Sequence, residues 1–159
     1  MTTRILGIDP GLRNTGWSII DKTGSTYTFV ACGVVHSTET KPLPERLVEL
    51  HRALVQIIAD FKPDTAGIEE IFVNKNPNST LKLGQARAAV MLAPALAGLV
   101  VGEYTPNQIK KSITGIGHAE KTQVDMMVRS ILKTVPEKIP PDASDAIGIA
   151  LCHAFIGGV

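Results

Sequence analysis

The sequence predicts an α/β fold: a mixed five-stranded sheet, three antiparallel strands followed by parallel crossovers, with helices on both faces. Three short apolar runs separated by turn residues open the chain, which is typical of an antiparallel meander. Apolar residues then recur three or four positions apart, and each of two later apolar runs follows such a helical segment. Because a helical crossover makes the next strand parallel to its neighbour, these two strands are expected to pair in parallel.

The first half of the chain alternates strand and helix signals. Apolar runs at residues 4–9, 16–21 and 27–36 predict the meander, and Pro10-Gly11 ends the first of them. Leu47, Leu50 and Leu54 follow the helical period, so residues 44–61 are expected to form an amphipathic helix with a proline in its first turn. The fourth strand is expected at residues 65–71.

The second helix is expected from residue 78 or 79 to about residue 99, with Asn78 or Ser79 as its cap. Its sequence is apolar nearly all round from Ala88 onward, which predicts burial on more than one side. The sheet can cover one side, and a second subunit could cover another. Pro94 should kink this helix or end it early. A fifth strand and three more helices complete the prediction, at residues 100–104, 106–114, 121–134 and 142–156.

Length and composition exclude several classes of protein. A chain of 159 residues with 44% hydrophobic and 19% charged residues suits one globular domain spanning residues 1–159. The longest uncharged run has 15 residues and contains Pro94, so it is too short to span a bilayer. Asp9 lies where a signal peptide would need its apolar stretch, and two cysteines make no disulfide framework. We therefore expect a cytoplasmic protein with reduced thiols and no membrane partner.

The net charge of +1 argues by itself against nucleic-acid binding, but the charges are unevenly distributed. Residues 73–138 carry a net charge of +5, from nine basic and four acidic side chains. If five of the acids outside this segment gather at one site, a basic surface surrounds an acidic pocket; these five are Asp9, Glu69, Glu70, Asp142 and Asp145. The alternative is a set of ordinary solvated helix faces.

Five acidic residues are candidates for one site. Asp9 ends the first strand, Glu69 and Glu70 end the fourth, and Asp142 and Asp145 share a face of the last helix. If the first and fourth strands are parallel neighbours, Asp9 lies beside a glutamate, although the pattern does not say which one. Oxygen ligands alone favour Mg²⁺ or Mn²⁺, and two such ions can activate water and stabilise the leaving oxygen of a phosphodiester. Alternatively, Asp9 is a turn residue and the aspartates of the last helix are caps.

Six motifs in order resemble the RuvC family of bacterial Holliday junction resolvases: GIDPG at 7–11, TGW at 15–17, IEEIF at 68–72, LKLGQARA at 81–88, GIGHAEKTQV at 115–124 and DASDAIGIA at 142–150. The resemblance implies a ribonuclease H-like fold and a homodimer. It also implies Mg²⁺-dependent nicking of two symmetry-related strands of a four-way DNA junction, leaving 5′-phosphate and 3′-hydroxyl ends. The catalytic and metal-binding carboxylates it implies are Asp9, Glu69, Asp142 and Asp145, with two ions per site.

The same resemblance implies a set of DNA contacts. Phe72 matches an aromatic residue used against junction bases, although a core phenylalanine is the simpler interpretation. Lys110 and Lys121 match lysines near the scissile phosphate. Further candidates for backbone contacts are Lys75, Lys82, Arg87 and Lys111. A branch-migration motor complex is implied as a partner.

Three other functions remain open from the sequence. The segment at residues 7–16 also resembles the phosphate-binding turn of actin-like ATPases, but that fold needs two such domains and a longer chain. A second alternative is a nuclease of the same fold that acts on ribosomal RNA precursor. A third is a junction-binding module without catalysis, against which the four intact carboxylates argue.

Overall fold

A computed structural model describes residues 1–71, 75–132 and 134–159 and contains the expected mixed sheet. The five strands are β1 (Thr2–Asp9), β2 (Asn14–Thr23), β3 (Thr26–His36), β4 (Thr65–Glu69) and β5 (Val100–Tyr104). They are ordered β3-β2-β1-β4-β5. The first three pair antiparallel, whereas β4 pairs parallel with both β1 and β5. The prediction of a meander followed by two parallel crossovers is confirmed.

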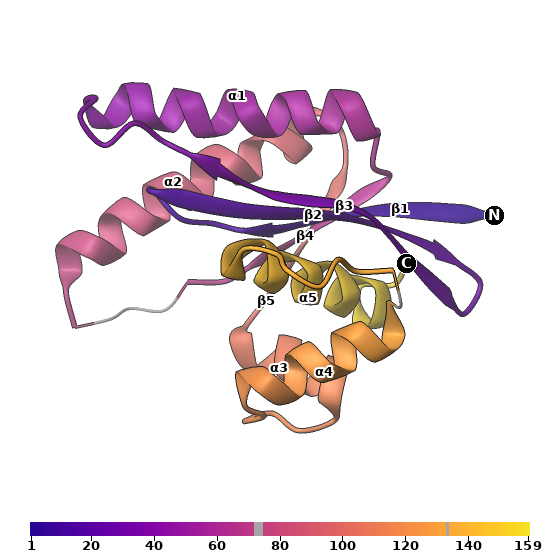
Figure 1. Cartoon of the computed structure of the whole chain (residues 1–159). Helices are drawn as coiled ribbons and strands as arrows, with labels where there is room; N and C mark the ends of the chain where they lie inside the picture. The colour runs from indigo at the N-terminus through magenta and orange to yellow at the C-terminus, as the bar shows by residue number, and fades with distance from the viewer. Residues whose placement is uncertain (72–74, 133) are drawn as a thin grey trace.

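Helices cover both faces of the sheet, also as expected (Figure 1). On one face lie α1 (Leu43–Phe61) and α2 (Pro77–Leu96), which enclose one apolar core against the sheet. On the other face lies α5 (Pro141–Ile156), with α3 (Pro106–Thr114) and α4 (Lys121–Ile131) packed beyond it around a second core. Among the described residues, no helix combines the length and apolarity that a membrane crossing requires.

Several element ends differ from the prediction by a few residues. Strand β4 ends at Glu69 instead of residue 71. Helix α2 is capped two or three residues earlier than expected, because the Asn76 side chain accepts hydrogen bonds from two backbone N–H groups after Pro77. It ends at Leu96, two residues after Pro94, and Gly98 then adopts a left-handed conformation. Helix α4 ends at residue 131 rather than 134.

The close approach of α5 to the sheet depends on two glycines. A Cβ at Gly7 would lie 2.2 Å from the backbone oxygen of Ala146, and a Cβ at Gly16 would lie 2.0 Å from that of Asp142. The buried Ser18 hydroxyl also donates a hydrogen bond to Ala146, at 2.8 Å. The first turn of α5 is thereby held against the carboxyl end of β1.

Candidate active site

Three aspartates from distant parts of the sequence converge at the carboxyl end of β1. Asp9 is the last residue of β1, and Asp142 and Asp145 lie in the first two turns of α5. One carboxylate oxygen of each can be chosen so that all three lie within 4.8 Å of one another. This confirms that the acids of the last helix and the first strand meet.

Glu69 is the glutamate that joins this cluster. It ends β4, whose parallel pairing with β1 brings the two strand ends together. The Glu69 carboxylate lies within hydrogen-bonding reach of the Asp9 carboxyl group. The structure thus decides between Glu69 and Glu70, which the alternation of side chains along a strand left open.

Burial and mutual repulsion raise the proton affinity of the cluster. The pKa of Asp9 rises to about 8, first because burial disfavours its charged form and then because Glu69, Asp145 and Asp142 are nearby. Burial also raises the pKa of Glu69 and that of Asp145. The Asp9 and Glu69 side chains share a hydrogen bond, so the two carboxyl groups titrate together as a pair.

Asp142 and Asp145 do not cap helix α5, which was the alternative interpretation of these residues. The N-cap of α5 is Pro140, and no side-chain hydrogen bond caps this end of the helix. Four carboxylates that share a partly buried site and offer only oxygen ligands fit a hard divalent cation. A cation there would replace the protons that the cluster otherwise retains.

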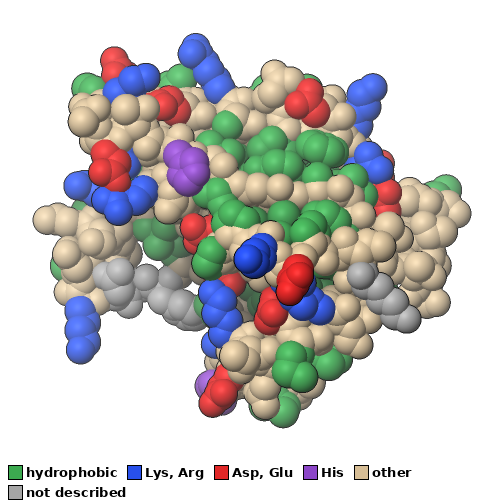
Figure 2. Space-filling model, viewed as in Figure 1, with side chains coloured by type: hydrophobic (Ala, Val, Ile, Leu, Met, Phe, Trp, Pro, Cys, Tyr) green, Lys and Arg blue, Asp and Glu red, His purple; other side chains and the backbone are tan. Residues whose placement is uncertain are grey.

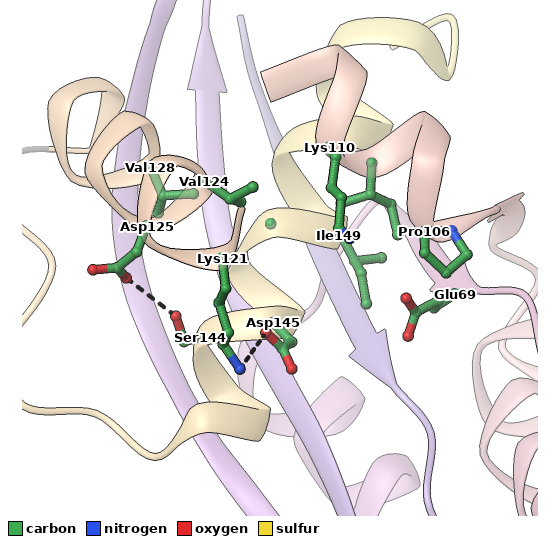
Figure 3. Close-up of a pocket in the computed structure, with 12 residues that line it drawn as sticks. Glu69, Pro106, Lys110, Lys121, Val124, Asp125, Val128, Ser144, Asp145 and Ile149 are labelled. Carbon is green, nitrogen blue, oxygen red and sulfur yellow. Dashed lines mark hydrogen bonds and ion pairs between the residues drawn. The ribbon is translucent and has the colours of Figure 1, made fainter. Parts of the chain in front are cut away.

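A hollow of about 280 Å³ beside the carboxylates lies between α3, α4 and α5 (Figure 3). Lys121 reaches across it from the start of α4, and its Nζ lies 3.4 Å from an oxygen of Asp145. Burial raises the pKa of Glu69 and that of Asp145 overall. The charge of Lys110, on α3, offsets part of the rise at Glu69, and the charge of Lys121 offsets part of the rise at Asp145. The two lysines therefore border the acidic site, and the Lys121 side chain is 67% exposed.

The other predicted DNA contacts have different surroundings. Lys75, Lys82 and Lys111 are exposed. Phe72 lies outside the described residues. Basic side chains are scattered among acidic ones on the face shown in Figure 2, so the expected basic surface is not one continuous patch in this view.

Arg87 does not lie with the exposed cations. Its side chain is only 14% exposed, its Nε donates to the backbone oxygen of Glu69 at 2.9 Å, and its Nη2 lies 2.5 Å from Glu103. No pattern in the sequence predicted this link between α2 and the end of β4. The signal for this link in the sequence is an arginine within a mostly apolar helix. Such an arginine fits a surface contact equally well.

The apolar lining of the hollow and one polar contact at its edge were also not predicted from the sequence. Ile109, Val124 and Ile149 line the hollow from three helices. The Ser144 hydroxyl lies 3.4 Å from Asp125, which links α5 to α4 beside Asp145. No spacing in the sequence predicts these contacts, because the three helices are brought together by packing around the second core.

Comparisons with known proteins agree with this architecture. The family model described as crossover junction endodeoxyribonuclease RuvC matches residues 5–153. A protein of that name from Xanthobacter autotrophicus is 56% identical over 156 residues, covering 98% of this chain and 91% of the relative. One from Rhodopseudomonas palustris is 52% identical over 153 residues, covering 95% and 86%.

A solved structure shares the whole fold. Thermus thermophilus RuvC, determined in complex with a Holliday junction substrate, superposes with a TM-score of 0.90 at 33% identity. The match covers 98% of this chain and 94% of the Thermus chain. It confirms the expected ribonuclease H-like architecture, and with the family match it shows that this chain belongs to the RuvC family of crossover junction endodeoxyribonucleases.

Proposed function

We propose that this protein is a crossover junction endodeoxyribonuclease that resolves four-way DNA junctions by paired hydrolysis of symmetry-related phosphodiesters. The observation that carries the proposal is the convergence of Asp9, Asp142 and Asp145, with Glu69 beside Asp9, in a chain of the RuvC family. The expected products are 5′-phosphate and 3′-hydroxyl ends. Residues 1–159 would act as one nuclease domain.

Asp9, Glu69, Asp142 and Asp145 would hold Mg²⁺, with Mn²⁺ as a substitute and two ions per site. The bound cations supply a Lewis acid and a means to activate water for attack on phosphorus. Asp9 is the central ligand in this proposal, because its carboxyl group is close to all three others. Its high proton affinity means that metal binding must displace a proton, so metal affinity should rise with pH up to about 8.

Lys110 and Lys121 would neutralise the phosphate at the active site. Lys121 is already paired with Asp145, so phosphate and Asp145 would compete for its ammonium group. Phe72, Lys75, Lys82 and Lys111 would contact the junction farther out. Phosphate contacts of this kind make binding strongly dependent on salt.

We propose a homodimer, because two equivalent sites match the two-fold symmetry of the strands to be cut. Leu92 and Leu96 on α2 support it: they are 50% and 71% exposed, within the segment predicted to be buried on more than one side. A branch-migration motor complex is the proposed functional partner. The proposed location is the cytoplasm, whose reducing conditions suit the free thiols of Cys32 and Cys152.

The test is cleavage of an end-labelled synthetic four-way junction and of a matched linear duplex, with Mg²⁺ or with EDTA. We expect paired symmetric nicks in the junction alone, lost with EDTA and with Asp9→Asn or Glu69→Gln. Binding without cleavage in Mg²⁺ and in Mn²⁺ would instead indicate a non-catalytic junction module. Preferential cleavage of structured RNA would indicate the nuclease of the same fold, and cleavage of both DNAs would remove junction specificity.

A further inference from the structure

We propose that Arg87 is a positioning residue that orients Glu69 through the main chain, and that it does not bind DNA phosphate. The inference rests on the proposed function, in which Glu69 is a metal ligand. It concerns a residue on the face of the sheet opposite to α5, on a helix that contributes no carboxylate to the site.

The geometry of the peptide unit between Glu69 and Glu70 supports this role. The carbonyl oxygen of this unit accepts a hydrogen bond from Arg87 Nε at 2.9 Å, and its N–H donates to the carbonyl oxygen of Tyr104 at 2.8 Å. Helix α2 and strand β5 therefore hold the two polar ends of one peptide plane. Rotation of this plane would turn the backbone at Glu69 and move its carboxylate relative to Asp9.

The support is needed because β4 loses one neighbour at this point. Pairing between β1 and β4 extends only to Ile8 and Ile68, whereas pairing with β5 continues to Glu69. Glu69 therefore lies at the end of a strand that is held by the sheet on one side only. The Arg87 hydrogen bond supplies a second anchor at that residue.

Glu103 on β5 holds the guanidinium in place for this contact. Its carboxylate lies 2.5 Å from Arg87 Nη2, so one planar group makes two hydrogen bonds in fixed directions. A lysine ammonium is a single point donor and cannot reproduce both contacts with this geometry. The predicted requirement is thus for the shape of arginine and not for its charge alone.

The alternative is that Arg87 contacts the DNA backbone, as the sequence analysis expected. A phosphate contact needs donors that face solvent, whereas this side chain is 14% exposed and donates to the Glu69 carbonyl oxygen and to the Glu103 carboxylate. The two roles predict changes in different measured quantities. Loss of a phosphate contact weakens binding and lowers the salt slope by about 1, while loss of a positioning contact slows the chemical step.

The experiment compares Arg87→Met and Arg87→Lys with the wild type. Junction affinity is measured at several salt concentrations in EDTA, and single-turnover cleavage is measured at saturating protein over a range of Mg²⁺ concentrations. Arg52→Met is the matched control, because it removes an exposed arginine from α1. Lys82→Met is the contrasting variant, because it removes a proposed phosphate contact from the same helix as Arg87.

For both Arg87 variants we expect affinity within about two-fold of wild type and an unchanged salt slope. We expect at least a ten-fold lower saturating cleavage rate, with the Mg²⁺ midpoint shifted to higher concentration. Lys82→Met should weaken binding and lower the salt slope by about 1. If Arg87→Met instead behaves like Lys82→Met, or like Arg52→Met, the positioning role is refuted.

Two further measurements keep the inference separate from folding and from the proposed function. If Arg87→Met does not fold, as judged by Trp17 fluorescence, Glu103→Gln takes its place, with an expected two- to five-fold loss of saturating rate at constant affinity. An unchanged rate would refute the role of the pair.

If the wild type does not cleave junctions, the proposed function fails, but the inference can still be tested by calorimetric Mn²⁺ binding without DNA. Weaker binding of Mn²⁺ by Arg87→Met than by the wild type supports the inference, and equal binding refutes it.

Discussion

Replacing Asp9 by asparagine should stabilise the metal-free protein, and the gain should grow with pH. In the folded protein Asp9 keeps its proton up to about pH 8, whereas in the unfolded chain its pKa is near 3.8. Unfolding therefore releases a proton throughout this interval. The stability contributed by the protonated carboxyl group is fully present below about pH 4 and lost above about pH 8.

The size of the effect follows from the shift in pKa. Each pH unit inside the interval changes the free energy of unfolding by about 1.4 kcal/mol for one proton. From pH 5.5 to pH 8, the stability of Asp9→Asn relative to wild type should therefore rise by about 3 kcal/mol. Coulomb's law gives a similar scale, since two full charges 4.8 Å apart repel by roughly 3.5 kcal/mol at an effective dielectric of 20. The asparagine amide can donate to Glu69 as the protonated carboxyl group does.

The assay is urea unfolding in EDTA at pH 5.5, 7 and 8, followed by the fluorescence of Trp17, the single tryptophan. Excess Mg²⁺ serves as the control: at 100 times its dissociation constant it should stabilise the wild type by about 2.7 kcal/mol, and Asp9→Asn by less. A stability difference between the two proteins that is the same at all three pH values would refute the electrostatic account of the cluster.

Two further predictions concern the packing that positions the site. Gly16→Ala should destabilise the protein by about 1–3 kcal/mol and reduce cleavage more than junction binding, because its Cβ would displace the backbone of Asp142. Urea unfolding and cleavage rates test this, with Gly84→Ala in α2 as a control expected to gain up to about 1 kcal/mol. Tyr104→Phe should cost about 1–2 kcal/mol, because Nδ1 of the buried His153 loses a hydroxyl partner 2.6 Å away. Equal urea midpoints for Tyr104→Phe and wild type would contradict that expectation.

The polar contacts of His153 also show why some of the core could not be predicted. Its Nε2 lies 2.7 Å from the Thr65 hydroxyl, which donates to the Val100 carbonyl oxygen, so Nε2 carries the proton and Nδ1 accepts from Tyr104. Burial lowers the pKa of this histidine, which keeps the ring neutral. Nothing in the spacing of these residues predicts that three elements share one buried imidazole.

The sequence by itself determined the order of the elements and the mixed sheet, and it nominated most residues of the proposed site. Local signals suffice for these features, because apolar period, turn residues and ordered motifs are properties of neighbouring positions. The prediction failed by a few residues where a tertiary contact fixes an end, as at Glu69, where the last residue of β4 is held by β5 and by Arg87.

Only the tertiary structure decided which charged groups meet. Strand periodicity leaves Glu69 and Glu70 equivalent, and only the family resemblance favoured Glu69. The parallel pairing of β1 and β4 is what brings Glu69 to Asp9. Arg87 and Lys82 are both cations on α2, yet one is enclosed against the strand end and the other is exposed. Electrostatic interactions and hydrogen bonds depend on distance and burial, and these quantities exist only once segments far apart in the chain have packed together.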